Sequence, residues 1–165
     1  MTLTGVQQAC NLRLAFQSHE NVETVFSSPL QRALQTALLA FGGMIPIDKS
    51  VIALPLAQET SHALCDTGRD VAALRELFPE SKIDYQFVEP DWSSKLGKWS
   101  QADAAVEERA TNLRDFLASR TELEVVLVTH GFFLHFLTEV NRVHLRAWPE
   151  LMRPCAGLER AREER

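Results

Sequence analysis

Two short stretches of this chain carry the side chains best suited to chemistry. They are residues 27–32 (Ser-Ser-Pro-Leu-Gln-Arg) and residues 126–131 (Val-Leu-Val-Thr-His-Gly). Each has the pattern of a buried strand that ends where a helix begins. Ligands of open α/β sheets bind where strands end, and a helix N-terminus offers free N–H groups and a partial positive charge. Arg32 and His130 at two such junctions therefore predict a pocket for a phosphate or another small anion.

Each junction also has a purely structural explanation. Thr129 could cap the helix, His130 could fill space and Gly131 could allow a tight turn. Arg32 could be a solvated arginine on the first turn of a helix. The occurrence of both junctions in one chain is what favours the anion pocket.

Length and charge narrow the classes of function. A chain of 165 residues suffices for one domain with a substantial core. The net charge of −5 argues against a broad surface for nucleic acid, so no nucleic-acid partner is predicted. A local anion pocket remains compatible with that charge, because geometry rather than net charge creates it.

The cysteines and histidines do not form a metal-binding or disulfide pattern. Cys10, Cys65 and Cys155 are far apart and include no C-x-x-C pair, which favours reduced thiols inside the cell. The five histidines show no H-E-x-x-H spacing. We therefore predict no metal and no cofactor.

No membrane association is predicted either. No apolar run approaches the roughly 20 residues that a membrane-spanning helix needs. Residues 1–5 lack the charged and apolar regions of a signal peptide. The sequence thus favours a cytoplasmic protein.

The elements that must position the two junctions alternate between helix and strand. Apolar spacing predicts a helix over residues 6–16, a strand over 22–26, and a helix capped by Ser28 that Gly42-Gly43 ends. A further strand is expected within 45–56, followed by a polar, turn-rich stretch at 58–70. The remaining expected elements are helices at 71–78 and 101–120, a strand at 124–129 and a helix at 131–140. Four consecutive Val or Leu residues predict that the strand at 124–129 is central and covered on both faces. The pattern predicts an α/β fold of three layers, with a mostly parallel sheet and helices on both faces.

One irregular segment, residues 91–99, contains two of the three tryptophans. It is either a packed loop anchored by Trp92 and Trp99 or a lid that shapes access to a substrate.

Several motifs together resemble the histidine phosphatase (phosphoglycerate-mutase-like) superfamily, and especially its fungal phosphoglycerate mutase family type. They are residues 1–9 (Met-Thr-Leu-Thr-Gly-Val-Gln-Gln-Ala), residues 27–37 (Ser-Ser-Pro-Leu-Gln-Arg-Ala-Leu-Gln-Thr-Ala), Gln58-Glu59 leading to Cys65-Asp66-Thr67-Gly68, and Val128-Thr129-His130-Gly131. The resemblance covers residues 1–141, which we predict to be the domain. Residues 142–165 are predicted to be a divergent C-terminal tail.

The resemblance implies roles for individual residues. In that family two Arg and two His side chains surround the phosphate. Arg32 matches the second arginine and His130 the second histidine, which stabilises the transferring phosphoryl group. Glu59 matches the proton donor, or else it is an exposed loop carboxylate. Ser28 and Gly131, at the two helix starts, are placed with Arg32 and His130 in the phosphate-binding set.

The family's nucleophilic histidine lies in an Arg-His-Gly motif on a strand upstream of the first helix, and these 165 residues contain no Arg-His pair. We therefore expect a truncated fold that lacks this segment, with impaired phosphohistidine chemistry. Loss of a central strand would leave unpaired backbone groups beside the strand that ends at His130. A rearranged strand or a second subunit in a homodimer would have to cover them, or the fold would be poorly stable.

Three functions follow as hypotheses. The first is a protein that binds a phosphate or another small anionic metabolite and is phosphomonoesterase- or mutase-like but impaired. The second uses the same pocket, with His130, Glu59 and His62, for acid–base isomerisation or dehydration of a small metabolite. The third is a non-catalytic module for binding or dimerisation.

Overall fold

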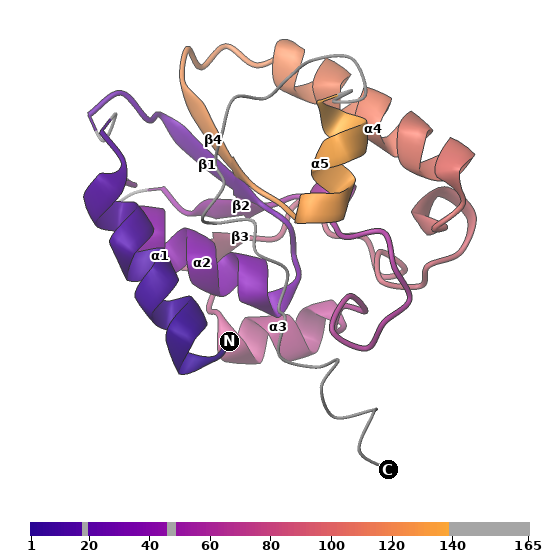
Figure 1. The fold of residues 1–165 in the computed structure, drawn as a ribbon, viewed down its shortest axis with the longest axis horizontal. Helices are drawn as coiled ribbons and strands as arrows, with labels where there is room; N and C mark the ends of the chain where they lie inside the picture. Colours follow the sequence, from indigo (N-terminus) through magenta and orange to yellow (C-terminus); the bar gives the residue numbers. More distant parts are fainter. Residues whose placement is uncertain (18–19, 46–48, 139–165) are drawn as a thin grey trace, which may run out of the picture.

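The computed structural model describes residues 1–17, 20–45 and 49–138, which form an α/β fold around one parallel sheet (Figure 1). The strands are β1 (Thr24–Ser27), β2 (Val51–Ala53), β3 (Ile83–Asp84) and β4 (Val125–Val128). Their order in the sheet is β3-β2-β1-β4, and all three pairings are parallel. The predicted α/β class with a parallel sheet is therefore confirmed.

Five helices in the described part of the chain cover the sheet: α1 (Leu3–Ala15), α2 (Gln31–Phe41), α3 (Val71–Leu77), α4 (Asp103–Ala118) and α5 (Gly131–Leu137). One apolar core joins α1, α2 and α3 to one face of the sheet, and a second core joins α4 and α5 to the other. The three predicted layers thus enclose two separate cores, one on each face of the sheet. Alternate residues of β4 contribute to each core. None of these helices is long and apolar enough to cross a membrane.

The helix that carries Arg32 begins later than the sequence predicts. Ser28 is not its N-cap, since α2 starts at Gln31 with Leu30 in the capping position. The amide of Ser28 still donates to the carbonyl of Val128 (2.9 Å), so the chain continues the pairing of the sheet at this residue. The Ser28 hydroxyl instead accepts from the amide of Leu30 (3.3 Å) in the turn that leads to the helix.

The position of β4 also differs from the sequence prediction. Within the described residues β4 pairs only with β1, so it lies at an edge of the sheet rather than in its centre. All four of its residues are half-buried as a result. The four aliphatic residues correctly predicted a strand covered on both faces, but they could not show which neighbours it has.

The tryptophan-containing segment is a packed loop. Trp92 is fully buried and Trp99 is 4% exposed. The side chain of Gln58, also buried, donates from Nε2 to the carbonyl of Trp92 (2.7 Å) and ties this loop to the segment that carries Glu59. The loop therefore forms a fixed wall behind the predicted site.

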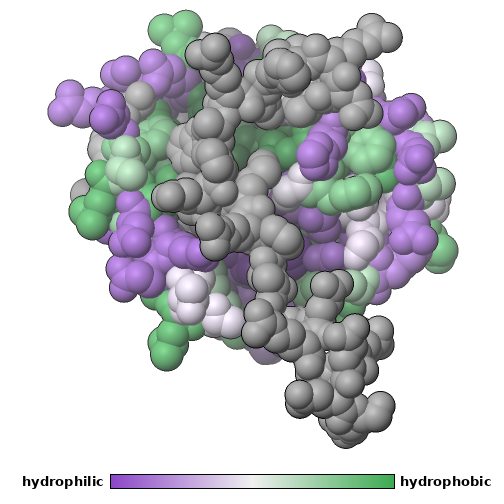
Figure 2. Space-filling view, viewed as in Figure 1, coloured by the Kyte–Doolittle hydropathy of each residue, from purple (hydrophilic) through white to green (hydrophobic). Residues whose placement is uncertain are grey.

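On the face shown in Figure 2, hydrophilic residues are dispersed among hydrophobic ones. Some predictions lie outside the described residues: the domain boundary at residue 141, the divergent tail at 142–165 and the last two residues of the helix expected at 131–140. Of the strand expected within 45–56, the structure describes β2.

Replacing Gly68 with Ala should destabilise the fold. A Cβ at residue 68 would overlap the ring of the buried Trp92, so the loop that carries Asp66 would have to shift. We expect a loss of about 1–3 kcal/mol in the free energy of unfolding. Urea denaturation followed by tryptophan fluorescence measures it.

Gly131→Ala is the matched control, because a Cβ at residue 131 would meet no atom within 4 Å. An equal loss of stability in the two variants would show that the overlap with Trp92 is unimportant.

Candidate functional site

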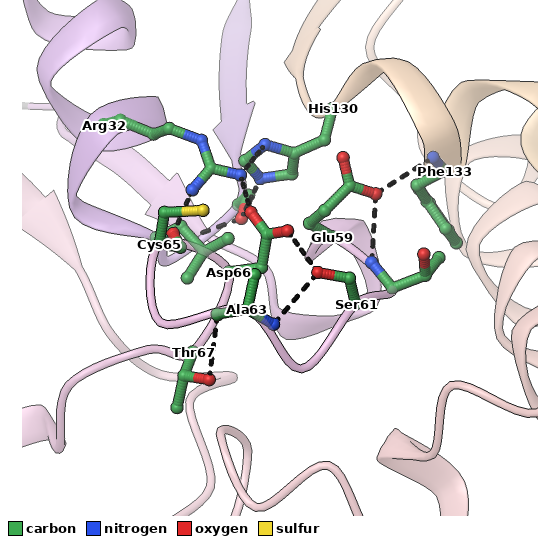
Figure 3. Close-up of polar contacts among 12 residues, drawn as sticks. Arg32, Glu59, Ser61, Ala63, Cys65, Asp66, Thr67, His130 and Phe133 are labelled. Carbon is green, nitrogen blue, oxygen red and sulfur yellow. Dashed lines mark hydrogen bonds and ion pairs between the residues drawn. The ribbon is translucent and has the colours of Figure 1, made fainter. Parts of the chain in front are cut away.

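The ends of two adjacent strands bring Arg32 and His130 together. β1 and β4 pair in register, with Ser27 opposite Val128, so the residues that follow emerge at the same edge of the sheet. Arg32 lies on the first turn of α2, and His130 immediately precedes α5. Nη2 of Arg32 lies 3.0 Å from Nδ1 of His130 (Figure 3).

The contacts of His130 define its protonation state. A guanidinium group can only donate, so Nδ1 of His130 accepts from Arg32. Nε2 then carries the proton and donates to the hydroxyl of Ser28 (2.8 Å). Burial, with 7% of the residue exposed, and the charge of Arg32 lower the pKa of His130 to about 3. The imidazole is therefore neutral at pH 7.

Ser28 lies behind this imidazole. It is fully buried, and its hydroxyl contacts Nε2 of His130 and the amide of Leu30. These contacts make Ser28 a residue that orients the ring. Gly131, the other helix-start residue predicted to bind phosphate, is exposed at the beginning of α5.

A carboxylate already contacts Arg32. Nη2 of Arg32 is 2.7 Å from Oδ1 of Asp66, and Oδ2 of Asp66 accepts from the hydroxyl of Ser61 (2.5 Å). Nη1 of Arg32 donates to the carbonyl of Cys65. Burial alone would raise the pKa of Asp66, but the Ser61 hydrogen bond and the Arg32 charge outweigh it and hold the pKa below its usual value.

Glu59 lies beside the start of α5 (Figure 3). Its Oε1 accepts from the amides of Thr60 (3.0 Å) and Phe133 (3.2 Å). Phe133 lies in the first turn of α5, where backbone N–H groups have no partner within the helix. The half-buried Glu59 therefore stabilises α5 through its carboxylate, whatever chemistry it also performs.

Two buried cations complete the surroundings. Nζ of Lys95 donates to the carbonyl of Glu59 (2.6 Å), and burial together with the charge of Arg109 lowers the pKa of Lys95 to about 8. Arg109 is 2% exposed and stacks 4.6 Å from the ring centroid of Phe133. Its guanidinium nitrogens have no hydrogen-bond partner among the described residues, and burial lowers its pKa to about 10.

Sequence reasoning gave no role to Asp66, Lys95 or Arg109. Asp66 belongs to a motif that the resemblance includes, which was a usable signal. Arg109 lies in a charged stretch that is typical of a solvent-exposed helix face, and Lys95 lies in an irregular loop, so neither carried a signal of burial.

A cavity of about 380 Å³ lies next to Arg32. Cys65, Gly68 and Arg69 from the loop that carries Asp66 also line it. This volume is in the range of small-molecule sites, and two arginines give it a positive lining. His62 is exposed on the same loop and has no hydrogen bond to the other site residues within the described ranges.

Within the described ranges, no group of three or more His, Cys, Asp and Glu side chains could hold a metal ion. The charged groups of the site instead pair with one another or with backbone atoms, except Arg109, which stacks on Phe133. The arrangement can therefore recognise a small anion through Arg32, next to a neutral imidazole and two more buried cations.

Comparison with known proteins gives one family. The family model described as "Histidine phosphatase superfamily (branch 1)" matches residues 1–162. Two curated proteins of Arabidopsis thaliana are similar to the chain. "Phosphoglycerate mutase-like protein 1" is 30% identical over 95% of this chain and 65% of its own length, and "Phosphoglycerate mutase-like protein" is 32% identical over 83% of this chain and 61% of its own length. The chain thus spans less than two thirds of these relatives, and no solved structure matches it significantly.

Lowering the pH from 7 to 5 should reduce the free energy of unfolding through His130. In the unfolded chain the imidazole takes a proton below about pH 6.5, whereas in the fold it stays neutral down to about pH 3. The unfolded state binds more protons in this window, so this group lowers the stability by about 1.4 kcal/mol for each pH unit. Urea denaturation at several pH values measures the slope.

His130→Gln should flatten that slope, and His62→Gln, at an exposed position, is the matched control. An unchanged slope in His130→Gln would contradict the assignment of a buried, neutral imidazole.

Proposed function

Because the chain belongs to the histidine phosphatase superfamily, branch 1, we propose that it binds a phosphate or another small anionic metabolite at Arg32, beside His130. We further propose a phosphomonoesterase- or mutase-like site whose phosphoryl-transfer chemistry is impaired in residues 1–165. The contact between Arg32 and the buried His130 at the ends of two adjacent strands carries this proposal.

The charges of the site favour an anionic ligand. Arg32 can hold two phosphate oxygens, as guanidinium groups do. Lys95 and Arg109, both nearly fully buried, add positive charge that water does not screen. A phosphate next to His130 would raise the pKa of the imidazole, which would then gain a proton and donate from Nδ1 to the ligand.

The impairment is proposed from the nucleophile. Covalent phosphoryl transfer needs an imidazole nitrogen directed at phosphorus. Both ring nitrogens of His130 are engaged, with Arg32 and with Ser28, and the 165 residues contain no Arg-His pair. Glu59 remains the proposed proton donor to the leaving oxygen, because its carboxyl group lies in the same site (Figure 3).

Acid–base chemistry on a small metabolite is the second candidate. Its support is that His130 is neutral at pH 7, so Nδ1 could accept a proton from a substrate once Arg32 has released it. Lys95, whose pKa is lowered to about 8, and Glu59 are the other groups able to exchange a proton. His62 belongs to this hypothesis only if its loop moves, since the residue is exposed.

A homodimer is the third candidate, and the position of β4 supports it. Val125–Val128 lie half-buried at the edge of the described sheet and carry no charge. A second copy could therefore pair along this edge without bringing like charges together. A melting temperature that rises with protein concentration would support it. The cytoplasmic location and the fungal family type also remain proposals.

Replacing Arg32 or His130 with Ala should weaken the binding of inorganic phosphate. A hydrogen bond to a charged group contributes about 1.5–3 kcal/mol, so Arg32→Ala should lower the affinity about tenfold or more. Isothermal titration calorimetry measures it. Arg75→Ala is the control, because Arg75 pairs with the exposed Glu80 instead. Equal affinity in Arg32→Ala and the parent protein would contradict the proposed site.

Hydrolysis of p-nitrophenyl phosphate from acid to neutral pH tests the impairment. We expect the folded 165-residue chain to show little or no turnover. Turnover that disappears in both Arg32→Ala and His130→Ala would show that the residues present suffice for catalysis.

A further inference from the structure

We propose that Asp66 is an internal competitor for the anion site: its carboxylate holds the place on Arg32 that a phosphate takes, and it must leave before the ligand binds. The proposal rests on the proposed function, because it concerns access to the same site.

The contacts of Asp66 resemble those of a bound anion. One oxygen accepts from Nη2 of Arg32 at 2.7 Å, and the other accepts from the hydroxyl of Ser61 at 2.5 Å (Figure 3). Two oxygens of a bound phosphate could accept hydrogen bonds from the same arginine and the same hydroxyl group. With 15% of its side chain exposed, Asp66 is well shielded from water, so its ion pair with Arg32 is stronger than one on an open surface.

Arg32 cannot serve both partners in its present arrangement. Nη2 is shared by Asp66 and His130, and Nη1 donates to the carbonyl of Cys65. Both terminal nitrogens are therefore committed to the chain itself. Two further N–H groups remain, on Nε and Nη1, but a ligand that binds through two parallel hydrogen bonds needs an N–H of Nη2. Such a ligand has to replace one of these contacts, and the Asp66 carboxylate is the partner that a second anion repels.

Removal of Asp66 would make the site more positive. The charges of Asp66 and Glu59 raise the pKa of Lys95, and the charges of Arg109 and Arg32 lower it, so all four groups lie near this ammonium group. When Asp66 moves away, one carboxylate remains near three cations. An incoming anion then restores the charge balance that Asp66 provided.

The loop that carries Asp66 is held by hydrogen bonds within itself and to Arg32: the amides of Asp66 and Thr67 donate to the carbonyl of Ala63 (2.8 and 3.0 Å), and Arg32 contacts Cys65 and Asp66. Leu64 is 95% exposed and Cys65 is also exposed. Gly68 packs against the buried Trp92, which fixes the far end of the loop. Displacement of Asp66 therefore requires rearrangement of a short exposed segment rather than of the core.

The test compares the affinity for inorganic phosphate of the parent protein, Asp66→Asn and Ser61→Ala by isothermal titration calorimetry. Asp66→Asn keeps the shape of the side chain and removes its charge, so we expect at least tenfold tighter binding. Ser61→Ala removes only the support of Oδ2 and should give a smaller increase. Asp115→Asn, an exposed position on α4, is the matched control for the change of net charge and should bind as the parent protein does.

Equal or weaker binding by Asp66→Asn and Ser61→Ala than by the parent protein would overturn the proposal and make Asp66 a residue that positions Arg32. Arg32→Ala alone separates this failure from failure of the proposed function, because it weakens phosphate binding only if the proposed site exists. The double variant Arg32→Ala/Asp66→Asn tests whether a gain acts through Arg32. Loss of the gain in the double variant supports both proposals. Retention of the gain in the double variant, or no binding by any variant, overturns both.

Discussion

In-register parallel pairing of β1 and β4 is the constraint on which the site depends. The pairing runs from Thr24 opposite Val125 to Ser27 opposite Val128, and one more hydrogen bond extends it to Ser28. Because parallel strands end at the same edge, the residues that follow must meet there. A shift of one residue would turn the side chains of β4 to the opposite cores and separate Arg32 from His130.

Burial of charge is the second constraint on the site. Among the described residues, Asp66 and Glu59 supply the carboxylates that act on the buried cluster of Arg32, Lys95 and Arg109. A fourth cation on His130 would be costly in these surroundings, which is why the imidazole stays neutral. The site thus holds a cationic excess that favours a small anion, although the whole chain has a net charge of −5.

The sequence predicted what depends on local pattern. Apolar spacing gave the helices and the main strands, and the two strand–helix junctions gave Arg32 and His130. It missed β3, which has two residues, and it placed β4 in the centre of the sheet, because the neighbours of a strand are decided by tertiary contacts. Asp66, Lys95 and Arg109 were missed for the same reason, since only the packing of two loops and α4 brings them together.

Most polar groups of the described site have partners without a ligand, and the buried guanidinium of Arg109 is the exception. Asp66 pairs with Arg32, Glu59 accepts from the amide of Phe133, and Ser28 binds His130. Ligand affinity is therefore a difference between two sets of hydrogen bonds rather than the sum of new ones. A ligand with groups beyond its phosphate would add contacts that no protein group makes in the present arrangement. The cavity lined by Arg69 and Gly68 beside Arg32 is where those groups would lie.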